Sequence, residues 1–268
     1  MKKKINCFFF DFNAIITKNL EGDIVIGIFD SGIGGVTVLK EILKHNPNYH
    51  YVYYSDSKNN PYGDKNKDEI KKIVFDVVKY LIDKGCKVII IACNTASAVC
   101  VNDLRNTYTN ITFIAIEPAY KMVHDYNPNG KTLVMATRGT IESEKFQKLY
   151  NKYDNHNTIL YPCLGLAELI EKNDEIGIKK YLEDNIYQFK SVDNVVLGCT
   201  HYPLIKEQIR EILKDVTFFD GSMGISYELK RKLKELNINE ENNKIEFFDS
   251  AQSNLKKQRF FEILYNKK

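Results

Sequence analysis

The stretch 88–98, VIIIACNTASA, constrains the fold of this chain more than any other. Its run of four β-branched residues is typical of a strand buried on both faces, as in a parallel sheet. Cys93 follows at the carboxyl end of that strand, which is where ligands bind in open α/β sheets. Asn94, Thr95 and Ser97 can supply polar side chains and an N-cap for a following helix, whose N-terminus favours an anion such as a thiolate. We therefore expect a reactive thiol at the edge of a parallel sheet.

A second stretch, 192–204 (VDNVVLGCTHYPL), repeats this plan with Cys199 and Thr200. Along the whole chain, apolar runs typical of strands alternate with segments of helical period. This alternation predicts an α/β fold of mostly parallel sheets flanked by helices. Besides the two cysteine strands, the expected strands are 24–29, 49–54, 111–116, 132–136, 157–161, 216–219 and 245–248. The expected helices are 36–44, 68–84, 96–108, 119–126, 143–150, 164–171, 175–189, 204–213, 227–236 and 255–265.

The alternation looks duplicated, which predicts two pseudo-symmetric domains. One half has a strand followed by DSGIGG and then a strand followed by ACNT, and the other half has TRGT and GCTH in the same places. We expect residues 1–22 to be an N-terminal extension, 23–116 with 224–268 to form the first domain, and 117–223 to form the second. If the strand ends face each other, the two thiols flank one interdomain cleft, the usual location of a small-ligand site.

The composition of the chain bears on its binding partners and on its location in the cell. The net charge is only +3 with acids and bases interspersed, so the charge gives no argument for nucleic acid. Six cysteines without a C-x-x-C pair in 268 residues favour reduced thiols and a cytoplasmic protein. The apolar run 5–16 is interrupted by Asn6, Asp11 and Asn13 and lacks a cleavage site, so we do not interpret it as a signal peptide. No other apolar run approaches the length that a membrane span requires.

Opposed thiols suit the removal of a proton from one face of a carbon and its delivery to the opposite face. A thiol can serve as base or acid after modest tuning of its pKa, because its ordinary value lies within reach of neutral pH. The thiolate needs an activator, and the neutral thiol needs a proton source. Asp30, at the end of the first strand, and His201, close after Cys199, suit these roles.

Four motifs in order, FDSGIGG, NNPYGD, ACNTASA and GCTHYP, resemble those of the glutamate racemases in the cofactor-independent aspartate/glutamate racemase superfamily. The resemblance extends from Ile24 to the terminal helix. It implies a two-domain pseudo-symmetric α/β fold and the interconversion of L- and D-glutamate with no pyridoxal phosphate or other cofactor. It also implies that the product D-glutamate feeds peptidoglycan synthesis, and through it cell-wall biogenesis and cell shape.

Carried over to this chain, the resemblance assigns Cys93 as the base for D-glutamate and Cys199 as the base for L-glutamate. Asp30 would assist Cys93, and His201 would assist Cys199. The helper glutamate of the family aligns with Glu171 in CLGLAELIE, although both prolines of the family pattern are absent here. The threonine loop reads ATRGT where the family often has a glycine before the first threonine. The implied substrate contacts are Asp30, Ser31, Tyr62, Gly63, Asn94, Thr95, Thr137, Thr140, Thr200 and His201.

Two other classes of site, for dinucleotides and for metals, do not fit the sequence. The turn 32–35 lacks the last glycine of a dinucleotide fingerprint, because Thr37 stands there, and no His/Cys/Asp spacing resembles a metal site. Cys7, Cys86, Cys100 and Cys163 are expected to be structural. Two rival functions are a sibling racemase acting on aspartate or a hydantoin, and a binding protein with this fold that has lost turnover. A homodimer is retained as a candidate assembly.

Overall fold

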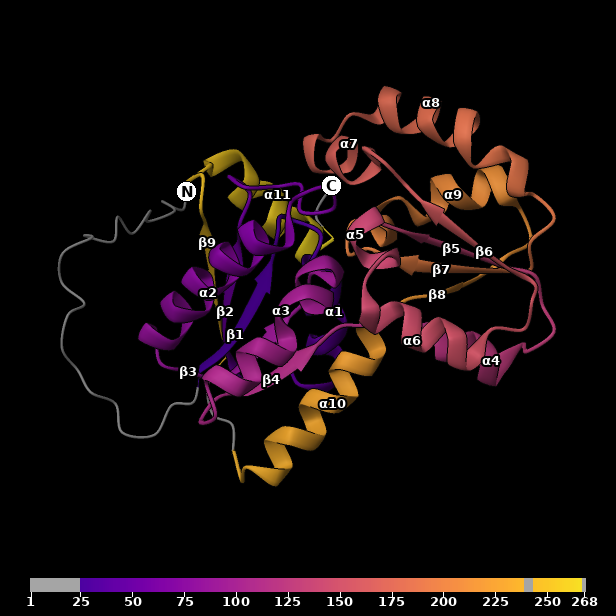
Figure 1. Cartoon of the computed structure of the whole chain (residues 1–268). Helices are drawn as coiled ribbons and strands as arrows, with labels where there is room; N and C mark the ends of the chain where they lie inside the picture. Colours follow the sequence, from indigo (N-terminus) through magenta and orange to yellow (C-terminus); the bar gives the residue numbers. More distant parts are fainter. Residues whose placement is uncertain (1–24, 239–242, 267–268) are drawn as a thin grey trace, which may run out of the picture.

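The computed structural model describes residues 25–238 and 243–266, and it contains two parallel sheets that are each covered by helices (Figure 1). The prediction of an α/β fold with two mostly parallel sheets is confirmed. The expected N-terminal extension, 1–22, and Cys7 lie outside the described residues. No helix within the described residues is both long enough and apolar enough to cross a bilayer.

Five parallel strands form the first sheet: β1 (Val25–Asp30), β2 (His50–Ser55), β3 (Cys86–Ile91), β4 (Thr112–Ala115) and β9 (Lys244–Asp249). Their order is β4-β3-β1-β2-β9, so the last strand of the chain returns to an edge. One face packs against α1 (Val36–His45), α10 (Ser222–Glu235) and α11 (Asn254–Leu264). The other face packs against α2 (Lys67–Asp83) and α3 (Asn94–Thr107). This double cover explains why β1 and β3 are almost wholly apolar.

Four parallel strands form the second sheet: β5 (Thr132–Ala136), β6 (Thr158–Pro162), β7 (Asn194–Gly198) and β8 (Thr217–Phe219), in the order β6-β5-β7-β8. On one face lie α7 (Leu166–Lys172), α8 (Glu175–Asn185) and α9 (Lys206–Leu213), with the 3₁₀ turns Tyr187–Phe189 and Tyr202–Ile205. On the other face lie α4 (Tyr120–Tyr126), α5 (Arg138–Ile141) and α6 (Glu144–Tyr153).

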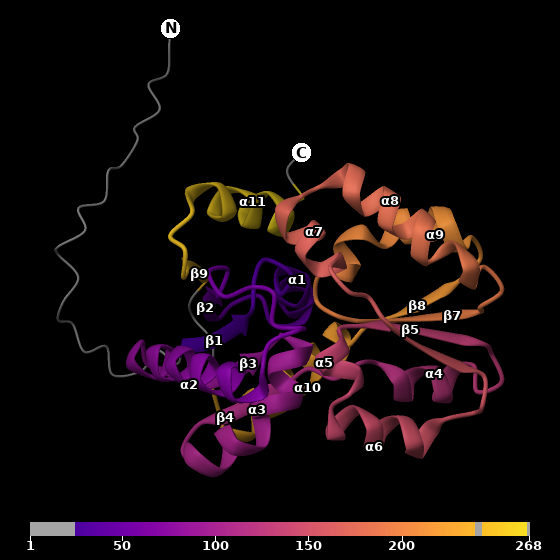
Figure 2. The ribbon, with the colours of Figure 1, turned by 45° about the horizontal axis from the view of Figure 1, so that its top comes forward.

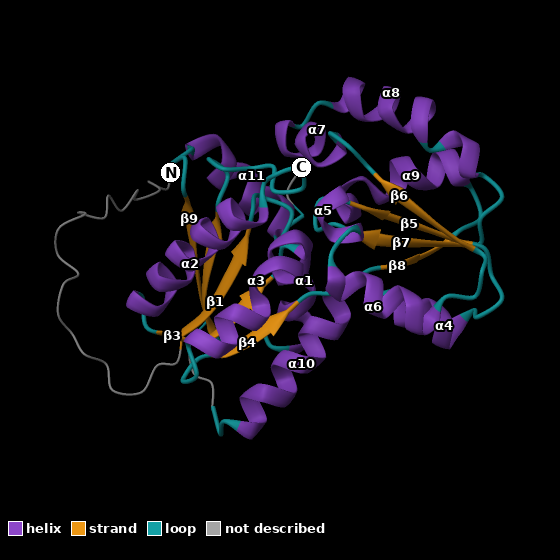
Figure 3. Ribbon diagram, viewed as in Figure 1, coloured by secondary structure: helices purple, strands orange, loops and turns teal. Residues whose placement is uncertain are grey.

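The two sheets lie beside each other, and the carboxyl ends of β5 and β7 point toward the unit built on the first sheet (Figure 3). The two units remain side by side when the molecule is turned (Figure 2). A backbone hydrogen bond of 3.1 Å from the N–H of Gly139 to the carbonyl of Gly63 joins them near these strand ends. The loops that follow the strands of one sheet therefore meet the loops of the other.

Two expectations about helix starts are wrong. The helix after Cys93 begins at Asn94 rather than at 96, because the Cys93 carbonyl already accepts the first helical hydrogen bond from the N–H of Ser97 at 2.9 Å. Cys93 itself is the N-cap residue, and Asn94, Thr95 and Ser97 lie within α3 instead of capping it. The helix expected at 227–236 begins at Ser222, where the carboxylate of Asp220 accepts the Ser222 N–H at 2.9 Å. The four-residue α5 was not expected at all.

Candidate active site

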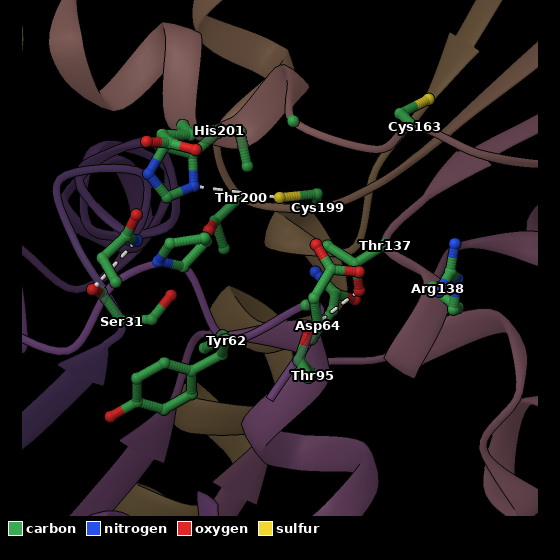
Figure 4. A pocket seen from close by; sticks show the side chains of 18 of the residues that line it. Ser31, Tyr62, Asp64, Thr95, Thr137, Arg138, Cys163, Cys199, Thr200 and His201 are labelled. Atoms are coloured by element: carbon green, nitrogen blue, oxygen red, sulfur yellow. Dashed lines mark hydrogen bonds between the residues drawn. The ribbon is translucent and has the colours of Figure 1, made fainter. Parts of the chain in front are cut away.

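A narrow cavity of about 50 Å³ lies where the loops of the two sheets meet (Figure 4). The first sheet contributes its wall at residues 31, 60–64 and 93–95, and the second sheet contributes 137–138, 163–165, 167–168 and 199–201. Both Cys93 and Cys199 line it, each within two residues of the end of a buried strand of its own sheet. The structure thus brings together the two cysteines that the sequence pattern singled out.

Cys93 is almost fully buried at the junction of β3 and α3. Burial raises the pKa of its thiol to about 12, and the nearby Asp30 carboxylate adds to the increase. The Ser31 hydroxyl and the Ala96 N–H face the sulfur and oppose that increase in pKa. Cys93 is therefore a neutral thiol in this environment, and it needs a proton acceptor before it can act as a base.

Asp30 ends β1 and is completely buried behind the cavity wall. Its Oδ1 atom accepts the Gly32 N–H at 3.0 Å, and its Oδ2 atom accepts the Thr200 hydroxyl at 3.0 Å. Burial raises the pKa of Asp30, although the charge of His201 and these two hydrogen bonds pull the pKa down. A carboxyl group held in this balance can exchange a proton with a neighbouring thiol.

Cys199 follows β7 and is paired with His201. Its Sγ atom lies 3.8 Å from Nδ1 of His201 (Figure 4). The other ring nitrogen, Nε2, lies 2.8 Å from Oε2 of Glu171. Burial lowers the pKa of His201, but the contacts with Cys199 and Glu171 outweigh it and raise the pKa well above the ordinary value. Nδ1 of His201 is therefore close enough to the Cys199 sulfur to exchange a proton with it during a reaction.

Three threonine hydroxyls gather on the opposite side of the cavity from His201. Thr95 Oγ1 lies 2.9 Å from Thr137 Oγ1, which in turn donates to Thr140 Oγ1 at 2.9 Å. Thr137 also caps α5 by accepting the N–H of Thr140. The first N–H groups of α3 have no partner within the helix, so this corner presents hydroxyls and N–H groups to an anion.

Asn94 adds a polar group without a partner. Its side-chain oxygen is buried and accepts no hydrogen bond from any residue that the structure describes. Because an unsatisfied buried acceptor costs free energy, an oxygen of this kind at a cavity wall is suited to a donor on a bound molecule, such as an ammonium group.

The hydroxyl group of Tyr62 does not face the cavity, although the residue forms part of the cavity wall. Its hydroxyl donates to Asp56 at 2.5 Å and points away from the cavity, while its ring packs near Phe29 (Figure 4). The side chain thus holds the loop 60–64, and only the rest of the residue faces the cavity. Asn60 steadies the same loop by donating to the Ser31 carbonyl at 3.1 Å.

The glycines that follow β1 allow the segment 31–35 to approach residues of the second sheet closely. A Cβ atom at Gly34 would lie 2.7 Å from both Nδ1 of His201 and Oγ1 of Thr200. A Cβ atom at Gly32 would lie 2.4 Å from Oε2 of Glu171. The side chains of Glu171 and His201 therefore pack directly against the backbone of the segment DSGIGG, which leaves no space there for a larger residue.

The expected site residues fall into two layers. Lining the cavity are Ser31, Tyr62, Gly63, Cys93, Asn94, Thr95, Thr137, Cys199, Thr200 and His201. Asp30, Glu171 and Thr140 do not line it and act through a neighbour that does. The cavity wall also includes residues that the sequence did not single out as ligand contacts, among them Asn60, Asp64, Arg138, Cys163 and Glu168. All five stand inside the segments NNPYGD, ATRGT and CLGLAELIE, which could have identified them.

The described residues do not form a cluster of side chains typical of a metal site. Within residues 25–238 and 243–266, no three His, Cys, Asp or Glu side chains are grouped so that they could hold an ion. The five cysteines described there are free thiols.

The chain is similar to known proteins in both sequence and structure. A sequence model of the Asp/Glu/hydantoin racemase family matches residues 36–222. A glutamate racemase from Clostridium novyi is 44% identical over 238 residues, which is 85% of this chain and 92% of the relative. Among solved structures, a glutamate racemase isoform from Bacillus anthracis has a TM-score of 0.79 at 28% identity, covering 91% of this chain and 95% of that one. A glutamate racemase from Francisella tularensis in complex with D-glutamate has a TM-score of 0.75 at 30% identity, covering 92% and 95%.

Proposed function

The chain belongs to the Asp/Glu/hydantoin racemase family, and we propose that it interconverts L- and D-glutamate by proton transfer between Cα and two cysteines, Cys93 and Cys199. The curated relatives and solved structures similar to it are glutamate racemases, which supports glutamate as the substrate. The observation that carries the mechanism is the pair of thiols in one narrow cavity, each with its own acid–base partner.

In the direction from L- to D-glutamate, the Cys199 thiolate takes the Cα proton while the Cys93 thiol delivers a proton to the opposite face. The high pKa of Cys93 keeps it protonated and ready to donate, and His201, whose pKa is raised, lies beside the Cys199 sulfur as its acid–base partner. The reverse direction begins with Cys93 as a thiolate, its proton passed to Asp30. Each turnover therefore leaves the two thiols in exchanged protonation states.

The Cα proton of an amino acid is very weakly acidic, so the site must stabilise negative charge that develops on the α-carboxylate. The hydroxyls of Thr95 and Thr137, which Thr140 supports from behind, and the N-terminus of α3 can act as donors for such charge. Asn94 can accept a hydrogen bond from the α-ammonium group. We propose that these groups, and no cofactor, support the reaction.

The decisive experiment follows Cα in heavy water. Purified protein is incubated with L-glutamate, D-glutamate or L-aspartate, and optical rotation and deuterium at Cα are measured. The proposal expects loss of rotation and deuterium incorporation with both glutamate enantiomers and neither change with aspartate. Turnover of aspartate alone would show that the substrate is aspartate and not glutamate. Binding of glutamate without deuterium incorporation would show that the chain is a binding protein and not a racemase.

We also propose, from the resemblance, that the D-glutamate formed is supplied to peptidoglycan synthesis in the cytoplasm, and thereby to cell-wall biogenesis and cell shape. A host strain that depends on external D-glutamate should grow without it when this chain is expressed. The limits 23–116 with 224–268 and 117–223 for the two domains stay predictions, as does the homodimer. Limited proteolysis tests the domain limits, and sedimentation velocity tests the assembly.

A further inference from the structure

Lys256 makes a contact that the proposed mechanism does not use. It lies in the first turn of α11, on the first sheet, and its Nζ atom is 2.6 Å from Oε1 of Glu171 in α7, on the second. The carboxylate is almost fully buried, whereas the lysine side chain is about a quarter exposed. An ion pair with one buried partner is weakened less by solvent than a pair at the surface.

The same helix holds the backbone of α7. Arg259, one turn after Lys256, donates to the carbonyl oxygens of Glu171 at 2.7 Å and Ile170 at 2.9 Å. A cation is favourable there because the last carbonyl groups of a helix have no partner within it. In both views of the ribbon α11 lies beside α7 (Figures 1 and 2). Arg259 thus fixes the helix end, and Lys256 fixes the carboxylate.

A short series of contacts connects Lys256 with the sulfur of Cys199. Glu171 presents Oε1 to Lys256 and Oε2 to Nε2 of His201, at 2.6 and 2.8 Å. Its Oε2 atom also accepts the Ile33 N–H at 2.9 Å, so the carboxylate cannot turn freely. His201 then lies 3.8 Å from the Cys199 sulfur through its other nitrogen.

We propose that Lys256 is a positioning residue for the Cys199 half of the site, where it shares the negative charge of Glu171 with His201. A carboxylate that faces His201 alone would bind the imidazolium proton tightly. With Lys256 on its other oxygen, the same carboxylate stabilises the positive charge of the ring less strongly, so the proton on Nδ1, the nitrogen that faces the sulfur, can pass between His201 and Cys199. The inference rests on the proposed two-cysteine reaction for its kinetic consequence, but its electrostatic part stands without any substrate.

The sign of the effect follows from the charges around the pair. Removal of Lys256 takes away a positive charge that repels the imidazolium, so the pKa of His201 must rise further if Glu171 stays in place. Arg259 faces Glu171 from α11, and Tyr53 and Asp30 face it from the first sheet, and none of these changes in a Lys256 variant. The titratable groups packed around the Glu171–His201 pair are therefore Asp30, Tyr53, Cys199, Lys256 and Arg259.

The direct test measures the imidazole itself. The His201 ring signal is followed by NMR from pH 5 to 10.5, in a Cys199→Ala background that removes the coupled titration of the thiol. We expect Lys256→Met to move the midpoint to higher pH by on the order of one pH unit, and Lys256→Arg to restore it. Lys257→Met removes an exposed charge from the same helix and should leave the midpoint unchanged. An unchanged or lowered midpoint in Lys256→Met would overturn the proposal.

The kinetic test uses the chain with both cysteines intact. Because enantiomers have equal free energies, kcat/KM must be the same in both directions in every variant, so kcat and KM are compared separately. We expect Lys256→Met to lower kcat about tenfold and to move the alkaline limb of its pH profile upward, with Lys256→Arg and Lys257→Met close to the unmodified chain. If the unmodified chain does not racemise glutamate, the proposed function is wrong. The NMR experiment still tests whether Lys256 affects the pKa of His201, because it needs no substrate.

Discussion

Thr200 donates a hydrogen bond of 3.0 Å to the carboxylate of Asp30, and this bond joins the strand end that carries Cys199 to the strand end that stands beside Cys93. Both residues are buried, and they are separated by 170 positions in the chain. The two half-sites are therefore coupled through a direct bond between their supporting residues, in addition to the substrate that would lie between the thiols.

Thr200→Val tests this coupling. Valine keeps the shape of threonine but removes the donor, so the pKa of the buried Asp30 carboxyl should rise further. Because ionised Asp30 is needed to accept the Cys93 proton, the acidic limb of kcat/KM should move to higher pH. The rate at neutral pH should fall about tenfold, the loss expected for one buried hydrogen bond to a charged group. The exposed Thr217→Val on β8 is the control, and identical pH profiles for both variants would refute the coupling.

Cys93→Ala and Cys199→Ala should each lower racemisation by roughly a thousandfold or more, since each removes one of the two proton carriers. They should still differ in heavy water. Cys199→Ala keeps Cys93 and should exchange the Cα proton of D-glutamate without inverting it, whereas Cys93→Ala should exchange that of L-glutamate.

Cys100→Ala, in α3 and away from the cavity, is the matched control and should racemise normally. Far-UV circular dichroism should show that all three variants are folded. Exchange into both enantiomers by one single variant would contradict a division of labour between the two thiols.

Much of this site could be predicted because its main groups follow directly from strands. Cys93, Cys199 and Asp30 each stand where a buried apolar run ends, and the carboxyl ends of parallel strands share one edge of a sheet. Apart from the missed helix α5 and the early start of α10, the strands and helices were predicted to within a few residues, because the change of period from apolar runs to helical spacing is local information.

The rest depends on contacts between distant segments. Nothing near Lys256 in the sequence indicates that it meets Glu171, or that Glu171 meets Ile33. The return of β9 to the edge beside β2 likewise has no local signal. The hydroxyl of Tyr62 binds Asp56 rather than facing the cavity, because the conformation of the loop between them decides its direction and no periodic pattern specifies that conformation.

Gly34→Ala should damage the site by crowding alone. The added Cβ would lie 2.7 Å from Nδ1 of His201 and Oγ1 of Thr200, and 2.8 Å from the backbone nitrogen of His201, so the two loops must separate. A displacement of this kind near reacting groups lowers kcat/KM by about a hundredfold.

Gly224→Ala serves as the control for the same substitution. Outside its own helix, no atom of the residues that the structure describes lies within 4 Å of its added Cβ, and it stands inside α10, where alanine favours the helix by about 0.5–1 kcal/mol. Kinetics and thermal unfolding of both variants should separate loss of activity from loss of stability. A fully active Gly34→Ala would show that this close approach is not needed for turnover.

Glu171 should make the free energy of unfolding depend on pH within a limited acidic range. Burial opposes its ionisation, but His201, Lys256 and the Ile33 N–H outweigh burial and lower its pKa from the ordinary 4.5 to about 2. A carboxyl whose pKa is lower in the folded than in the unfolded chain stabilises the fold above the unfolded value, and that contribution is lost as the pH falls toward the folded value. The window is therefore pH 4.5 down to about 2.

Glu171→Gln keeps the size of the side chain and removes the charge, so it should lose on the order of 3 kcal/mol of unfolding free energy near pH 6. That difference from the unmodified chain should shrink steadily between pH 4.5 and pH 2, as urea unfolding at each pH would measure. Glu168→Gln, on the same helix, breaks only an exposed pair with Lys172 and should cost less than about 1 kcal/mol. A Glu171→Gln deficit that does not change with pH would mean that packing, and not the ionised carboxylate between Lys256 and His201, stabilises this junction of the two sheets.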